Sequence, residues 1–196
     1  AQDYAYVVGV GSGNDKYGDD ADFGATLLLT DATKLKVDLD SDSTDKYDST
    51  QEAREALEGY IVSYSKDSDG LYTLTKRSDN RIDLKDNTFN ATGLEIKSGT
   101  SAMKIFATDD YYANSSTIFL LYDGDDYTVY TGIKNVPDVK GDADTNAVVF
   151  DKGGVAKVVY IENANVDGDD EVIFVVGDTG AKAQKDNETN TKYYEY

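Results

Sequence analysis

The chain has 196 residues and carries 38 acidic against 19 basic side chains, a formal net charge of −19, with no Cys, His or Trp. Disulfides, thiolate or Ser-His-Asp nucleophile systems, and zinc or iron sites of the usual His/Cys kind are therefore excluded. Because so acidic a surface repels phosphate backbones and anionic lipid, we expect no nucleic-acid partner. No apolar run reaches the roughly 18 residues of a membrane span, so we also expect no membrane insertion.

The first half of the chain has the pattern of a small five-stranded barrel. Tyr4–Gly11 predicts a strand with Tyr6, Val8 and Val10 on one face. The only helix expected covers residues 50–58, because Ser49 or Thr50 can cap it and Gly59 can end it. The other strands expected here are Ala25–Thr30, Lys34–Asp40, Tyr60–Ser65, Leu71–Lys76 and Arg81–Leu84.

The second half is organised around a β-hairpin in the run Thr117–Gly132. With Gly124-Asp125 as a two-residue loop, Tyr122 lies opposite Tyr127, and both belong to the buried face. Phe119 and Leu121 point to the other face, so the first strand of the hairpin is apolar on both sides and expected to be central. Further strands are expected at Met103–Thr108, Ala147–Phe150, Val155–Ile161 and Val172–Val176.

This succession of short strands predicts an all-β, mostly antiparallel fold with one short helix, arranged as two small barrel- or sandwich-like subdomains. The N-terminal β subdomain would span residues 1–95 and contain the helix, and the C-terminal β subdomain would span residues 96–178. The boundary falls where the strand pattern loosens, within Thr88–Ser101. Residues 179–196 would form a polar tail or a linker to a following module.

Six runs of strand and turn residues also suggest a family: Tyr4–Val8, Gly59–Tyr64, Gly70–Leu74, Thr117–Phe119, Tyr130–Pro137 and Val155–Ile161. Together they resemble a module of the surface proteins of Clostridia-type gut bacteria that carry S-layer homology domains, which bind cell-wall polymer. The resemblance covers nearly the whole chain, although the helical repeats of the S-layer homology domain itself are absent. It implies a place at the cell surface and no catalytic residues.

Calcium is the one cofactor that the residues suggest, because it takes six to eight hard oxygens. Four clusters could supply them: Asn14–Asp22, Asp38–Asp45, Asp123–Asp126 and Asn163–Glu171. In the last cluster the candidate ligands are Asn163, Asn165, Asp167 and Asp169, with Gly168 at position six of an EF-type loop. Position twelve is Phe174, which cannot ligate, so that motif fails. The alternative, which we favour, is the ordinary turn chemistry of Asp, Asn and Gly.

These observations predict a non-catalytic structural module of a bacterial cell-surface, S-layer-associated protein, secreted to the surface or wall of a Gram-positive-type cell. The expected partners are other modules of the same long protein, and cell-wall or surface glycans are a further candidate. The alternative is a carbohydrate- or ligand-binding module of an exported multidomain protein, with tyrosines stacking on sugars. A glycoside hydrolase needs two paired carboxylates, and no local pattern selects two among the 38 acids, so no enzyme is expected.

Overall fold

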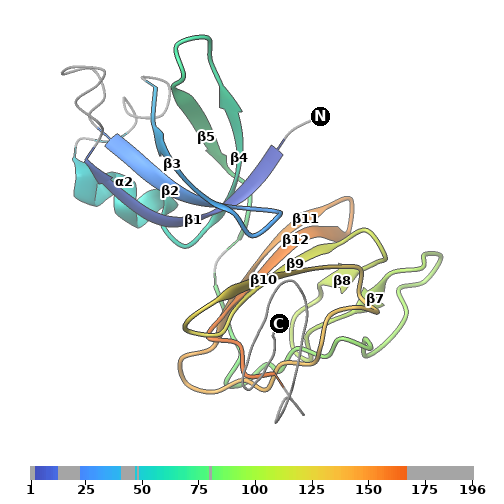
Figure 1. The fold of residues 1–196 in the computed structure, drawn as a ribbon. Helices are drawn as coiled ribbons and strands as arrows, with labels where there is room; N and C mark the ends of the chain where they lie inside the picture. Colours follow the sequence, from blue (N-terminus) through green and yellow to red (C-terminus); the bar gives the residue numbers. More distant parts are fainter. Residues whose placement is uncertain (1–2, 13–22, 41–46, 48, 80, 167–196) are drawn as a thin grey trace, which may run out of the picture. The chain divides into compact units, whose positions relative to one another are not determined.

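The computed structural model describes residues 3–12, 23–40, 47, 49–79 and 81–166 (Figure 1). Contacts along the chain separate Ala1–Asn165 from Val166–Tyr196, and the fold described below is that of Ala1–Asn165. It confirms the all-β, mostly antiparallel prediction. The described residues form two five-stranded sheets, one two-stranded sheet and a single short helix.

The first sheet has the strand order β3-β2-β1-β4-β5, and every pairing in it is antiparallel. Its strands are β1 (Asp3–Ser12), β2 (Phe23–Leu29), β3 (Lys34–Asp38), β4 (Ile61–Lys66) and β5 (Tyr72–Lys76). The two outer strands are joined at a parallel bridge, Leu39 to Tyr72, where the amide of Asp40 donates to the Tyr72 carbonyl at 2.9 Å. With a helix between β3 and β4, this connectivity is that of the OB fold, a partly open five-stranded barrel.

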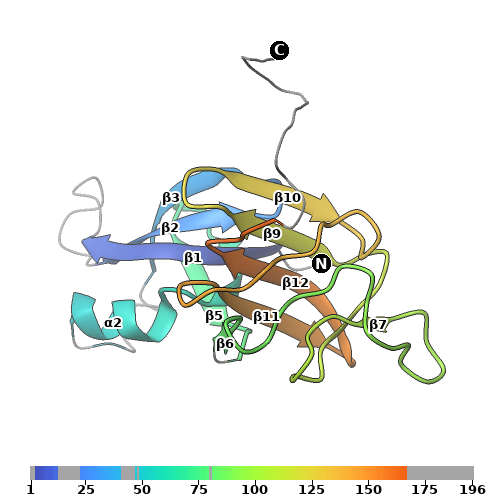
Figure 2. The ribbon, with the colours of Figure 1, turned by 90° about the horizontal axis from the view of Figure 1, so that it is seen from below.

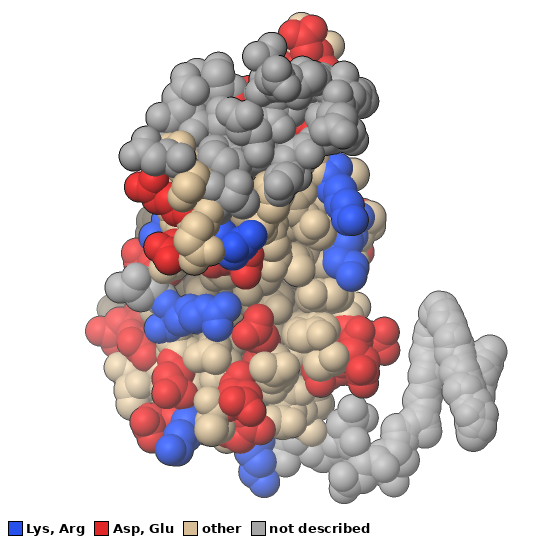
Figure 3. Space-filling view, turned by 90° about the vertical axis from the view of Figure 1, so that its left-hand side faces the viewer, with Lys and Arg blue, Asp and Glu red and all other residues tan. Residues whose placement is uncertain are grey.

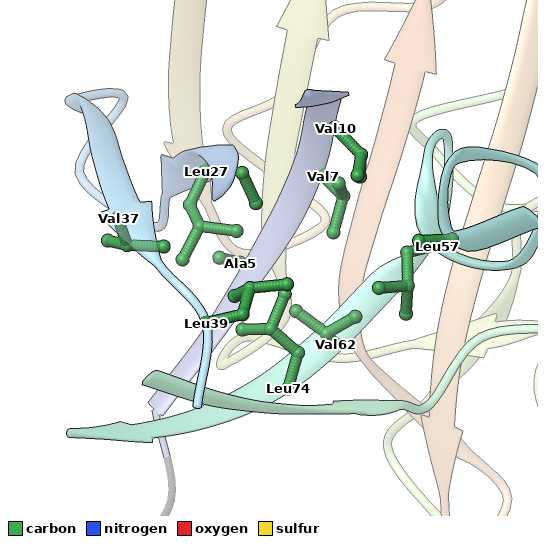
Figure 4. Close-up of a cluster of buried hydrophobic side chains, with 11 residues drawn as sticks. Ala5, Val7, Val10, Leu27, Val37, Leu39, Leu57, Val62 and Leu74 are labelled. Atoms are coloured by element: carbon green, nitrogen blue, oxygen red, sulfur yellow. The ribbon is translucent and has the colours of Figure 1, made fainter. Parts of the chain in front are cut away.

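The helix α2 (Thr50–Leu57) covers one end of this barrel and is the helix that the sequence predicts. The Ser49 hydroxyl caps it by accepting from the amide of Glu52 at 3.1 Å. Gly59 follows the helix with φ of +89°, a left-handed conformation that glycine adopts without strain. Figure 4 shows Leu57 of the helix pointing into the apolar interior of the barrel.

The core of the barrel is built from the inward faces of its strands and of α2 (Figure 4). Its buried members are Ala5, Val7, Val10, Ala25, Leu27, Val37, Leu39, Ala53, Leu57, Val62 and Leu74. The expectation that Val10 shares a face with Tyr6 and Val8 is wrong. The register between β1 and β2 shifts between Val7 and Gly9, and such a bulge inserts one residue and moves Val10 to the face of Val7.

The second sheet has the order β10-β9-β12-β11-β6 (Figure 2). Its strands are β6 (Ile82–Asp83), β9 (Ile118–Tyr122), β10 (Tyr127–Thr131), β11 (Asn146–Lys152) and β12 (Val155–Glu162). All its pairings are antiparallel except that of β9 with β12, which is parallel. Two short strands, β7 (Met103–Lys104) and β8 (Tyr112–Ala113), form the third sheet.

Two predicted strands differ from the structure, one in its length and the other in the sheet to which it belongs. The strand expected over Met103–Thr108 is only the two residues of β7. The short strand expected near Arg81–Leu84 exists as β6, but it pairs with β11 of the second sheet. The division of the chain at residues 95 and 96 stays a prediction, and the strand expected over Val172–Val176 lies outside the described residues.

The central hairpin has the register that the sequence predicts. Tyr122 pairs with Tyr127 and Leu120 with Val129, and the amide of Asp123 donates to the Asp126 carbonyl at 3.2 Å, which closes the loop. β9 lies between β10 and β12 and is buried on both faces, as expected for a strand that is apolar throughout.

A second core joins the two five-stranded sheets. Tyr6, Leu28 and Ile61, on the outer face of the barrel, belong to one buried cluster with side chains of the second sheet. Those partners are Leu120, Val148, Phe150, Val158 and Tyr160. Aromatic contacts add to it, with the rings of Tyr4 and Phe150 4.8 Å apart. The outer face of the barrel is therefore an apolar packing surface.

Candidate functional site

Three loops at one end of the second sheet border an open polar cleft of about 450 Å³, here called the acidic cleft. They are the loop after β9, the loop before β11 and the segment after β12. The cleft is lined by Asp123, Asp142, Ala143, Asp144, Asn146, Glu162, Asn163 and Asn165. Carboxylates and amides dominate this lining, so the cleft can accept hydrogen bonds from a polyhydroxylated ligand or attract a cation.

Asp142 accepts hydrogen bonds on both of its carboxylate oxygens. One of its oxygens, Oδ1, accepts from the amide of Asp144 at 2.9 Å and from the hydroxyl of the buried Thr145 at 3.0 Å. The other, Oδ2, accepts from the side-chain amide of Asn165 at 2.7 Å. These donors, the Asp144 amide first, hold the pKa of Asp142 below its usual value because they stabilise the charged form. The carboxylate is thus engaged by protein donors.

The structure brings together only some of the calcium candidates. Asn163 and Asn165 both line the acidic cleft, together with Asp123 from a cluster that the sequence treats as separate. The amide nitrogen of Asn163 donates to the Asp144 carbonyl at 3.0 Å. Asp167 and Asp169 lie outside the described residues, as do Asn14–Asp22 and residues 41–45. Within the described ranges, no group of three or more Asp or Glu side chains is placed to hold a metal ion.

The cluster Asp123–Asp126 serves the hairpin turn. Oδ1 of Asp123 accepts from the amides of Asp125 and Asp126, both at 2.8 Å. This local pattern is the ordinary way in which an Asp side chain stabilises a turn. Burial, with Asp123 and Asp125 nearby, raises the pKa of Asp126.

A second group of polar side chains, here called the tyrosine junction, lies between the two sheets and consists of Tyr6, Arg81, Tyr160 and Glu162. The rings of Tyr6 (β1) and Tyr160 (β12) stack with centroids 3.5 Å apart and planes 13° from parallel. Both hydroxyls donate to the same oxygen of Glu162, Oε1, each at 3.4 Å. Arg81 forms an ion pair with the other oxygen, Oε2, at 3.4 Å.

The environment of the tyrosine junction keeps both phenols neutral. Burial is the main cause that raises the pKa of Tyr6 and that of Tyr160 well above the usual range, and the Glu162 carboxylate adds to it. A neutral phenol can donate its proton to a hydrogen bond, and both do so to Glu162. Sequence reasoning did not find this group, because Tyr6 and Tyr160 come from strands at opposite ends of the described chain and Arg81 from the segment before β6.

On the face seen in Figure 3, acidic side chains gather in several separate groups with basic ones between them. In the part of the chain that the structure describes, no helix has the length and apolar character needed to cross a membrane.

The fold and the site define a β-protein in which an OB-type barrel is packed, through its outer face, on a second sheet with a polar cleft at one end. Comparisons of the chain with models of protein families, with curated proteins and with solved structures find no match.

Adding millimolar calcium is expected to leave the melting temperature unchanged relative to a chelator baseline. A ligand that binds the folded state raises the melting temperature by mass action. Asp142 already accepts three protein hydrogen bonds, and the side-chain amides of Asn163 and Asn165 donate to oxygens of the loop before β11. A calcium-dependent rise that is lost in Asn165→Ala but kept in Asp125→Ala would instead show calcium bound in the cleft.

Proposed function

We propose that this chain is a non-catalytic structural module of a bacterial cell-surface, S-layer-associated protein. The observation that carries the proposal is the packing of the outer face of the barrel on the second sheet. OB barrels bind oligonucleotides and oligosaccharides on the face of strands 2 and 3 and with the adjoining loops. In this chain the barrel surface is used to hold two sheets together.

The contacts at that surface support this view. Leu28 of β2 is fully buried in the core between the sheets. The ammonium of Lys34, at the start of β3, lies over the ring of Tyr127 at 5.5 Å from its centroid. The second sheet thus covers part of the surface on which an OB barrel would hold a ligand. Two sheets packed together in this way suit a module with a structural role.

Two further features support a place outside the cell. The strand and turn runs resemble a module of surface proteins with S-layer homology domains, and the chain has no Cys, which makes its fold independent of redox conditions. A net charge of −19 keeps such a module soluble. Its partners would be the other modules of the same long protein.

The second candidate is carbohydrate binding, which the acidic cleft favours. Carboxylates and amides lining a cleft can orient a sugar through its hydroxyls, and Asn146 and Asp144 lie in this lining. The stacked tyrosines Tyr122 and Tyr127 belong to the hairpin whose loop begins with Asp123 of the cleft.

Antibodies raised against the chain are expected to label intact, unpermeabilised cells of the bacterium that produces it. A structural module at the surface also predicts no binding on an array of cell-wall and surface glycans. Labelling that requires lysis of the cells contradicts the proposed location. Glycan binding that is lost in Asn146→Ala and kept in Ile96→Ala, an exposed residue outside the cleft, would favour the second candidate.

A further inference from the structure

Tyrosine is the side chain in this protein that loses an electron most readily. The chain has 16 Tyr, a single Met, and neither Cys nor Trp. Thiols and indoles, which otherwise compete for oxidants, are absent. A one-electron oxidant that acts on this protein therefore forms tyrosyl radicals, and the outcome depends on which tyrosines lie close enough to react with each other.

The Tyr6–Tyr160 pair has the geometry for such a reaction. Its rings are nearly parallel and their centroids are 3.5 Å apart. Both hydroxyls reach the same oxygen of Glu162, so the two rings point the same way. The ring positions next to the hydroxyls, which carry much of the unpaired spin of a phenoxyl radical, thus belong to two rings in stacking contact with their hydroxyls on the same side.

Glu162 supplies the second requirement, a proton acceptor. A phenol that loses an electron becomes a strong acid and must release its proton at the same time. The Glu162 carboxylate accepts a hydrogen bond from each phenol at 3.4 Å, and its side chain is 26% exposed, so a proton taken up there can pass to water. Arg81 forms an ion pair with the other carboxylate oxygen at 3.4 Å.

We propose that Tyr6 and Tyr160 are a site of oxidative cross-linking, in which a peroxide-class oxidant joins the two rings as dityrosine. Each phenol gives up one electron and one proton, and the two radicals form a carbon–carbon bond between the ring positions next to the hydroxyls. The hydrogen left on each bonded carbon moves to oxygen and restores the phenol. The two electrons break the O–O bond of one peroxide, which with hydrogen peroxide yields two waters.

The bond would join β1 of the barrel covalently to β12 of the second sheet. It would therefore tie together the two sheets whose packing carries the proposed function, although the chemistry itself does not depend on that function. Like a disulfide that closes a long loop, it is expected to raise the melting temperature by restricting the unfolded chain.

Two other tyrosine pairs serve as internal comparisons. Tyr122 and Tyr127 stack at 4.5 Å with planes 22° apart, while Tyr64 and Tyr72 lie 5.9 Å apart with planes tilted by 40°. Neither pair has both hydroxyls on one carboxylate oxygen among the hydrogen bonds of the described residues. The Tyr6–Tyr160 link should thus form in preference to both.

The test treats the dilute, full 196-residue chain with persulfate and a photosensitising ruthenium complex, because this small oxidant does not need to dock. The monomer is then isolated, digested and examined by mass spectrometry. The expected result is a linked peptide pair containing Tyr6 and Tyr160, lighter by two hydrogens than its parts, in a monomer of raised melting temperature. The same treatment of the urea-unfolded chain should scatter the links over many tyrosines.

Matched variants separate the proposal from nonspecific oxidation. Tyr6→Phe and Tyr160→Phe keep a ring in the stack and should lose the link, whereas Tyr72→Phe should keep it. Glu162→Gln should slow its formation, because the amide cannot take up a proton. Circular dichroism and melting curves establish that each variant folds. A folded wild-type monomer that carries links only between other tyrosines, or none, overturns the proposal.

Discussion

Replacing Leu120 by Ala is expected to lower the free energy of unfolding by about 2–5 kcal/mol, the cost of a large-to-small change in a close-packed core. Leu120 is 0% exposed and belongs to the core between the two sheets. It pairs with Val129 across the hairpin and with Tyr160 of the parallel neighbour β12. The variant would leave a cavity in contact with both sheets. Urea or heat denaturation measures the loss.

The matched control is Asp125→Ala in the loop of the same hairpin. Asp125 is exposed, and the hydrogen bond it makes to Asp123 comes from its backbone amide, which Ala retains. A solvated side chain of this kind has little to lose, so the change should cost about 0.5 kcal/mol or less. If Asp125→Ala proved as damaging as Leu120→Ala, either the register or the burial of the hairpin would be wrong.

Phe89→Ala is expected to cost about 3–5 kcal/mol, the usual range for removing a fully buried phenylalanine ring. Phe89 is 0% exposed although it belongs to none of the named strands. Its ring packs edge-on against Phe106 at 5.7 Å and Phe119 at 5.6 Å, on the face of β9 turned away from the barrel. Edge-to-face packing of this kind adds to the stabilisation that burial provides.

Ile96→Ala controls for the segment that contains Phe89. Ile96 is 69% exposed, so the loss of its side chain should change stability by about 0.5 kcal/mol or less. Chemical denaturation of the two variants beside the parent chain gives both values. A small effect of Phe89→Ala would mean that the loop segment contributes little to the second core.

Local signals in the sequence determined the hairpins and the helix. The Gly124-Asp125 loop set the pairing of Tyr122 with Tyr127, because a two-residue loop leaves one register that puts the apolar side chains on the same face. Ser49 and Gly59 marked the ends of α2 through capping and a positive φ. The class of fold follows from such elements, since each depends on residues only a few positions apart.

The candidate site depends on contacts that no local pattern encodes. The acidic cleft joins Asp123, Asp142 and Asn163 from three separate loops, and the tyrosine junction joins β1 to β12. In the sequence, Asp123 and Asn163 belong to two separate acidic clusters. Their meeting follows from the parallel pairing of β9 with β12, whose carboxyl ends carry these residues to the same edge.

The sequence by itself thus determined strand alternation, turns, one helix and an acidic, Cys-free surface, because these arise from side-chain period and local hydrogen bonding. Only the tertiary structure decided the bulge that turns Val10 inward and the burial of Tyr6, Leu28 and Ile61 against a second sheet. An outward-facing apolar residue on a strand has the same local pattern whether it meets solvent or another sheet. Which of these it meets depends on the packing of segments far apart in the chain. The hydrophobic effect drives that packing, but it leaves no periodic pattern in the sequence that would identify the partner.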